Sequence, residues 1–314
     1  MSSTQKTFER DSIEHRSLGL KAVLWAILLA ILWGGTSVSA KYSLETMGPF
    51  TVSCLRFVLG SIFVGCWCAW DRESLCVKKD QFVPIAILGT MLFFQIGLFT
   101  VGLKYSQATH GSLIINTYIF WVAGTEHFVT KHARLKPIQL LGLLLAFLGV
   151  FLIFSFSEKP AADAETHSLT ILFGDVLLLT SAMLLGIKVI YTKVAMKKVS
   201  PGNLIFWHNV VGVIFFAIVA CATETLDWDD FAWNPTLGLL YQGLVIAGFC
   251  FVMHAVLLKK HSASQLSAFS FATPIFGVVF AVVLLSEEAT LWILISGMTV
   301  ATGIVFVNFF GRNR

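Results

Sequence analysis

The stretch LWGGTSVSAKYSLETMGP (residues 32–49) has a counterpart 152 positions later in LLGIKVIYTKVAMKKVSP (residues 184–201). Matches at this offset pair Gly34 with Gly186, Lys41 with Lys193, Pro49 with Pro201 and Gly60 with Gly212. Offsets of 151 and 156 then pair Pro84 with Pro235, Lys104 with Lys260, Ser106 with Ser262 and Thr117 with Thr273. Matches among Gly, Pro and Lys carry more weight than matches among common apolar residues. The second half of the chain therefore repeats the first.

The composition places both copies in a lipid bilayer. Of the 314 residues, 56% are hydrophobic and only 13% are charged, and the mean hydropathy is +0.80. A helix needs about 20 apolar residues to cross the hydrocarbon core. Ten stretches reach that length: 20–40, 49–69, 82–103, 107–127, 137–156, 170–192, 202–222, 236–257, 264–285 and 290–310. They show no period-2 alternation, so we predict an all-α polytopic membrane protein with ten transmembrane helices.

Each copy has five spans. Because an odd number of spans ends on the opposite side of the membrane from where it began, the two copies are inverted relative to each other. Inverted repeats are a common way to build carriers that alternate between two faces of a membrane. If alternate loops lie on opposite sides, 17 Lys and Arg residues fall on the side of the N-terminus and three on the other. The positive-inside rule then predicts that both termini are cytoplasmic.

The pattern divides the chain into five parts. We expect a cytoplasmic tail at 1–19, a first five-helix repeat at 20–156, an outer linker at 157–169, a second repeat at 170–310 and a short cytoplasmic end at 311–314. The six cysteines lack paired spacing, and no phosphate loop or metal-ligand motif occurs. We therefore predict no cofactor, no metal and no nucleic-acid partner.

Ionisable residues inside spans are costly and usually face the interior of a bundle. Arg56 in span two and its repeat mate His208 in span seven lie at mirrored depths, where they are candidates for substrate or gate contacts. Arg56 can alternatively extend to the interface, and His208 can satisfy a local hydrogen bond. Lys188 and Glu126 are candidates for coupling or for a gate. The alternative for Lys188 is extension of its side chain to the cytoplasmic interface, and the alternative for Glu126 is an interfacial position that water reaches.

A mixed polar and aromatic set lies near the predicted midplane. Span four carries Asn116, Thr117, Tyr118 and Trp121, span nine carries Ser270, Thr273 and Pro274, and the facing spans carry Gln95 and Tyr241. A proline within a helix frees a carbonyl group and kinks the helix, and carriers use such breaks to bind substrates. We predict that this set as a whole lines the substrate pathway, although for any single Tyr or Trp an interfacial or packing role is favoured.

Several stretches resemble the drug/metabolite transporter superfamily, in particular its ten-helix EamA-type branch. These are Trp33-Gly34-Gly35 with Lys41, Pro49 with Leu55-Arg56-Phe57, Leu103-Lys104-Tyr105-Ser106 with Ala108, and Ser264 to Pro274 with Ser286-Glu287. The resemblance implies two inverted five-helix repeats that move a small metabolite, often outward, across a bacterial inner membrane. Trp33 joins the gate candidates. Tyr118 stands where the family has a proline, which predicts a straighter fourth span.

These observations predict a secondary transporter, an exporter of amino acids or related carboxylates, that works by alternating access. The alternative is an exporter of multiple drugs or amphipathic cations, because the chain is rich in aromatic residues. An integral membrane enzyme or a receptor is favoured less, since no reactive cluster or extramembranous domain is seen. The expected partners are a small-molecule substrate, the lipid bilayer and, for coupling, protons. A monomer and a homodimer both remain open.

Overall fold

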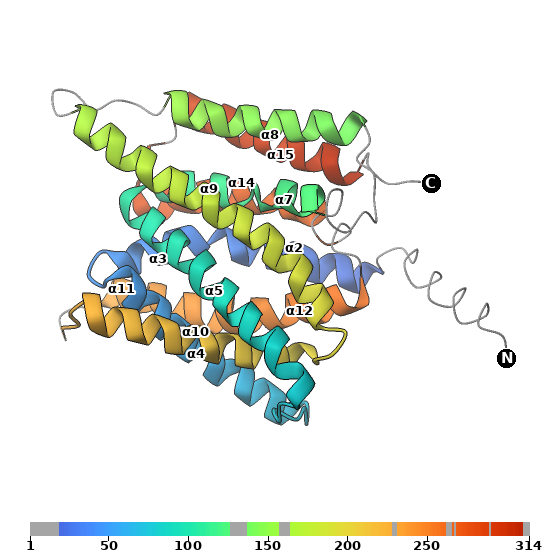
Figure 1. The fold of residues 1–314 in the computed structure, drawn as a ribbon. Coiled ribbons are helices and arrows are strands. Elements are labelled where there is room, and N and C mark those ends of the chain that lie inside the picture. The colour runs from blue at the N-terminus through green and yellow to red at the C-terminus, as the bar shows by residue number, and fades with distance from the viewer. Residues whose placement is uncertain are drawn as a thin grey trace.

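A computed structural model describes residues 19–125, 137–156, 164–227, 231–261, 266, 268–288 and 290–309 (Figure 1). The helices of the first half are α2 (Leu20–Gly34), α3 (Thr36–Leu44), α4 (Pro49–Trp70), α5 (Lys79–Tyr105), α6 (Ala108–Ile115), α7 (Tyr118–Thr125) and α8 (Pro137–Phe156). Those of the second half are α9 (Ala164–Ala195), α10 (Pro201–Thr223), α11 (Trp233–Leu240), η3 (Tyr241–Cys250), α12 (Phe251–Lys260), η4 (Ala268–Phe271), α14 (Ala272–Leu285) and α15 (Leu291–Phe309).

The described residues confirm an all-helical membrane protein. Six helical segments are long and apolar enough to cross a membrane: Leu20–Leu44, Pro49–Trp70, Lys79–Tyr105, Leu169–Ala195, Pro201–Thr223 and Trp233–Lys260. The other four apolar segments are α6 with α7, α8, η4 with α14, and α15. In the described part of the chain, the helices therefore coincide with the ten predicted spans.

The two halves pack as inverted equivalents. Helix α4 packs along its repeat mate α10, and α8 packs along its mate α15 at one edge of the bundle (Figure 1). After the end of α10, the Glu224 carboxylate accepts hydrogen bonds from the backbone N–H groups of Phe50 (3.0 Å) and Thr51 (2.7 Å) at the start of α4. After the end of α4, Glu73 accepts one from the N–H of Asn203 at the start of α10 (3.5 Å). The two mates are therefore antiparallel.

Several spans are interrupted near the middle of the bundle. The fourth span breaks at Asn116–Thr117, between α6 and α7, so the prediction of a straighter fourth helix is wrong. The break is stabilised without proline: the Asn116 side-chain amide donates to the Ser112 carbonyl (2.6 Å), and the Thr117 hydroxyl donates to the Ile114 carbonyl (2.7 Å). Asn and Thr side chains compete for backbone groups in this way. In the ninth span, the 3₁₀ turn η4 gives way to α14 at the equivalent position.

Candidate functional site

A cavity of about 150 Å³ lies between the two halves. A dry cavity of about this volume admits a molecule the size of benzene. The first half contributes wall residues from α2, α3, α4, α5, α6 and α7, and the second half contributes them from α9, α10, η3, α12 and α14. Eight of the predicted pathway and gate residues line it: Trp33, Arg56, Gln95, Asn116, Tyr118, Lys188, His208 and Thr273.

Arg56 lies in α4 with only 1% of its surface exposed. Its Nη1 donates a hydrogen bond to Oε1 of Gln242 in η3 (3.1 Å), and its Nε has no hydrogen-bond partner among the described residues. The guanidinium carbon is 6.0 Å from the ring centroid of Phe251, within the range of a cation–π interaction. A neutral amide and a ring face thus surround a charge that retains an unused donor.

Lys188 approaches the cavity from α9. Its Nζ donates a 2.7 Å hydrogen bond to Oε1 of Gln95 and lies 5.6 Å from the centroid of the Phe251 ring. The Gln95 amide is oriented by Ser181, whose hydroxyl accepts from Nε2 (3.1 Å) and donates to the Gln95 carbonyl (2.7 Å). This helix-to-helix network directs the amide oxygen of Gln95 at the ammonium group.

Two histidines complete the basic lining. His208 in α10 is buried, and its Nδ1 lies 3.0 Å from Oδ1 of Asn209. His254 in α12 meets the edge of the Trp33 ring at a centroid distance of 5.0 Å. His254 was not predicted as a site residue, because it lies toward the end of its span. The available signal was an ionisable residue inside the span, about one and a half turns before Lys259 and Lys260, which close α12.

The other predicted residues that the structure describes do not belong to the cavity wall. The Ser270 hydroxyl lies 3.2 Å from that of Tyr118, so Ser270 supports a lining residue. Trp121 packs against Gly186, and the Tyr241 hydroxyl donates to the Leu32 carbonyl at 2.7 Å. Thr117 and Pro274 are buried beside the breaks in their spans. Glu126 lies outside the described residues.

The chemistry of the cavity follows from its lining. Arg56, Lys188, His208 and His254 all face it, whereas no Asp or Glu belongs to its described wall. Trp33, Phe99, Tyr118 and Phe251 add aromatic surface. Such a wall can bind a negatively charged or zwitterionic group together with an apolar or aromatic portion.

Comparisons with known proteins agree with this architecture. The sequence profile of the EamA-like transporter family matches residues 20–155 and 172–309. An uncharacterised transporter of Bacillus subtilis, YoaV, is 23% identical over 296 residues, covering 94% of this chain and 99% of its own. A probable amino-acid metabolite efflux pump of Salmonella typhimurium is 24% identical over 299 residues, covering 91% of this chain and 94% of its own.

A solved crystal structure has the same fold. It superposes with a TM-score of 0.72 at 15% identity and covers 93% of this chain and 98% of that one. The profile match spans both halves of the chain and describes a family of membrane transporters, not of enzymes. The chain belongs to the EamA-like transporter family.

Proposed function

We propose that this protein is a secondary transporter that exports amino acids or related carboxylates across a bacterial inner membrane by alternating access. The observation that carries the proposal is the set of four basic side chains around one cavity whose described wall contains no acid. A zwitterion or an anion supplies the charge that this wall lacks.

Electrostatics favours such a substrate. A charge in a low-dielectric interior is strongly destabilising unless an opposite charge or good hydrogen bonds compensate it. Among the described residues, Arg56 contacts the Gln242 oxygen and the ring faces of Phe57 and Phe251. Lys188 contacts the Gln95 oxygen and the ring face of Phe251. None of these groups carries a negative charge. A carboxylate placed between Arg56 and Lys188 gains two charge-assisted hydrogen bonds, and the planar guanidinium can bind it with two parallel N–H groups.

The direction of transport is proposed from the shape of the site. The cavity extends to Thr192 and Leu258, near the ends of α9 and α12 that carry Lys193 and Lys259. The positive-inside rule assigns those lysines, and both termini, to the cytoplasm. A cavity that reaches toward the cytoplasm is suited to loading an exporter, in keeping with the efflux role that the Salmonella relative carries in its name.

The test is a thermal-stability screen of the purified protein. A compound that binds the folded state raises the unfolding temperature by mass action. Amino acids, dicarboxylates, nucleosides and lipophilic cations are screened against the wild type, Arg56→Ala, Lys188→Ala and the exposed control Lys259→Ala. We expect an amino acid or carboxylate to stabilise the wild type and Lys259→Ala, and to lose its effect in the two cavity variants. Flux of the compound in proteoliposomes then measures transport.

The contrary result is equally specific. If only lipophilic cations stabilise the protein, and Arg56→Ala responds as the wild type does, the carboxylate proposal is wrong. The cavity then belongs to an exporter of amphipathic cations, and the ring faces of the aromatic side chains in its wall attract those cations.

A further inference from the structure

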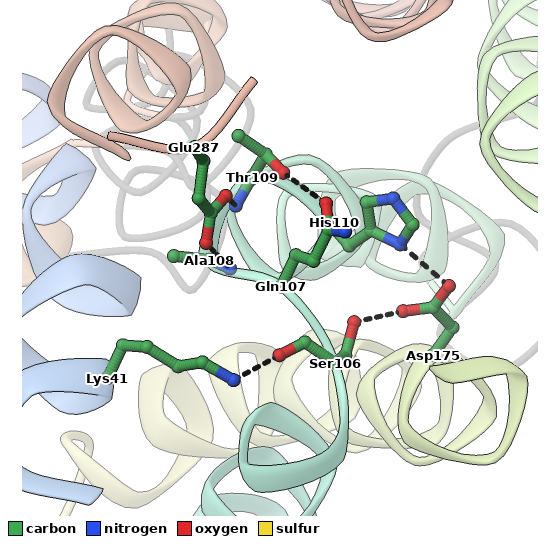
Figure 2. Close-up of polar contacts among 8 residues, drawn as sticks. All are labelled: Lys41, Ser106, Gln107, Ala108, Thr109, His110, Asp175 and Glu287. Atoms are coloured by element: carbon green, nitrogen blue, oxygen red, sulfur yellow. Dashed lines mark hydrogen bonds and ion pairs between the residues drawn. The ribbon is translucent and has the colours of Figure 1, made fainter. Parts of the chain in front are cut away.

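A buried acid–base pair lies outside the substrate cavity. Nδ1 of His110 in α6 is 2.8 Å from Oδ2 of Asp175 in α9, and the two side chains are 1% and 2% exposed (Figure 2). Asp175 is the one acidic residue that is buried within the described part of the chain. An ionisable pair in a membrane interior is a candidate functional site, because such groups are rare and costly there.

A line of polar groups leads from this pair toward the predicted outer surface. The Ser106 hydroxyl donates to Oδ1 of Asp175, and Nζ of Lys41 donates to the Ser106 carbonyl (Figure 2). Lys41 in turn lines an open vestibule of about 260 Å³, together with Glu45, Lys104 and Glu287. Water in that vestibule therefore lies within two polar contacts of Asp175.

The repeat shows that the fold does not need an ionisable pair here. The offset of 156 that holds for this span pairs His110 with Leu266, and the offset of 152 pairs Asp175 with Val23. Leu266 is buried in the same apolar cluster as Ala22 and Ala26 of α2. The described α2 residues that share a cluster with Leu266 are thus apolar, and Val23 itself is partly buried outside that cluster. Because well-packed apolar residues often stabilise as well as a buried ion pair does, packing alone does not account for His110 and Asp175.

The pair also joins two helices that both contribute residues to the cavity wall. Helix α6 packs against α9, and further along α6 the residues Ser112 and Asn116 line the cavity. His110 lies on the same short helix, between those residues and the vestibule. The His110–Asp175 contact therefore joins α6 to α9 on the vestibule side of the cavity residues of α6.

We propose that His110 and Asp175 form the outer gate of the transporter and the site at which an external proton opens it. In the closed structure, one proton shared by imidazole and carboxylate leaves the pair without net charge. A second proton, taken from the vestibule, converts the carboxylate to a carboxylic acid beside an imidazolium ion. The pair then carries one net positive charge and loses the attraction between opposite charges, so α6 separates from α9. Release of that proton restores the gate.

Other ionisable groups surround the pair. On the elements packed against α6 and α9 they are Lys41 and Tyr42 on α3, Lys79, Asp80, Lys104 and Tyr105 on α5, Tyr118 on α7, Glu287 after α14, and His254, Lys259 and Lys260 on α12, with Lys79 and Asp80 at the opposite end of α5 from Lys104. Lys104 and Tyr105 are exposed, and the α12 groups lie toward the opposite end of the bundle. Glu287 accepts from the N–H groups of Ala108 (2.7 Å) and Thr109 (2.9 Å) at the start of α6, beside the pair (Figure 2). Glu287 is therefore the competing candidate that a test has to separate.

The experiment measures gate opening without any substrate. Nitroxide labels are placed on the exposed positions Leu169 of α9 and Glu288 after α14, in a variant whose six cysteines are replaced. Pulsed electron resonance then gives the distance between labels in liposomes at about pH 8 and about pH 4, a range that includes protonation of carboxyl groups as well as of imidazoles. We expect longer distances at acidic pH in the parent protein. We expect the shift to be lost in His110→Leu/Asp175→Val, which installs the residues of the other repeat.

Further variants make the outcome decisive. Asp175→Asn keeps the size of the side chain and is also expected to lose the shift, so it replaces the double variant if that one does not fold. Glu287→Gln is expected to keep the shift. The proposal is overturned if the parent shows no shift, if the pair variants retain it, or if Glu287→Gln alone removes it. The measurement uses no transported compound, so failure of the carboxylate proposal leaves its result intact, and the stability screen is likewise independent of the gate.

Discussion

Lys188 and Gln95 are joined by a 2.7 Å hydrogen bond from Nζ to Oε1 inside the wall of the cavity. A neutral amide orients the ammonium group without neutralising it, so its charge remains available to a substrate. In the same way, Nη1 of Arg56 donates a 3.1 Å hydrogen bond to Oε1 of Gln242. The structure thus pairs each of these cations with a neutral amide, which leaves its charge without an opposite charge among these contacts.

Replacing that amide with an acid tests the arrangement. In Gln95→Glu, a carboxylate of nearly the same shape neutralises Lys188 from within the protein. We expect the affinity for a carboxylate substrate to fall at least tenfold, or about 1.4 kcal/mol, while the thermal stability of the empty protein does not decrease. Isothermal titration with the compound identified by the stability screen measures the affinity.

The control for the added charge is Gln81→Glu, at the start of α5 and outside the cavity. Its affinity should match that of the wild type. Equal weakening in both variants would mean that overall charge, and not the neutralisation of Lys188, determines binding.

Glycines of the two repeats allow equivalent helix contacts. A Cβ atom on Gly34 of α2 would lie 2.7 Å from Cβ of Phe276 in α14, and one on the mate Gly186 of α9 would lie 2.5 Å from Cβ of Trp121 in α7. Overpacking of this kind typically costs about 1–3 kcal/mol. We therefore expect Gly34→Ala and Gly186→Ala to lower the unfolding temperature in detergent. Gly124→Ala on α7, where a new Cβ meets nothing within 4 Å, should not.

The repeat could be predicted from the sequence because glycines at close helix contacts recur in both halves. Gly34 and Gly186 coincide at the offset of 152, and no other side chain can occupy their sites without displacing a neighbouring helix. The depth of Arg56 and Lys188 within apolar spans likewise indicated that they face the interior, and both line the cavity. Composition, spacing and burial cost suffice for inferences of this type.

Other parts of the site depend on rotation about the helix axis, which the sequence specifies only loosely at 100° per residue. Tyr118 lines the cavity, whereas Trp121, three residues later, packs beside Gly186. Asp175 was not predicted as a site residue, because it follows an acidic linker and its position in the sequence is typical of a residue at the membrane interface. The available signal was its repeat mate, Val23, since an acid replaces an apolar residue at one position of an otherwise apolar pattern.

Glu224 gives a third prediction, on stability. Its carboxylate accepts hydrogen bonds from two N–H groups at the start of α4, where the helix dipole also favours a negative charge. Loss of such a cap costs about 0.5–2 kcal/mol. We expect Glu224→Ala to lower the unfolding temperature, and its mate Glu73→Ala to do so less, since the described Glu73 contact is longer at 3.5 Å. The exposed control Glu288→Ala should leave the temperature unchanged; a comparable decrease there would show that the loss of any acid, not of a cap, is responsible.

The final prediction separates recognition from packing on α7. The Tyr118 hydroxyl lies on the cavity wall, 3.2 Å from that of Ser270, whereas Trp121 faces α9 outside the cavity. Tyr118→Phe removes one hydroxyl and leaves the ring, so it should change the relative affinities of substrates while the unfolding temperature of the empty protein stays close to that of the wild type. Trp121→Ala should lower the unfolding temperature and leave the relative affinities of substrates unchanged. Truncating a fully buried large side chain typically costs about 3–5 kcal/mol. The cost should be smaller here, because Trp121 is partly exposed. Competition binding with two carboxylates, measured beside thermal unfolding, tests both variants. If Trp121→Ala alters the ratio of affinities and Tyr118→Phe does not, the wall of the binding site lies on the other face of α7.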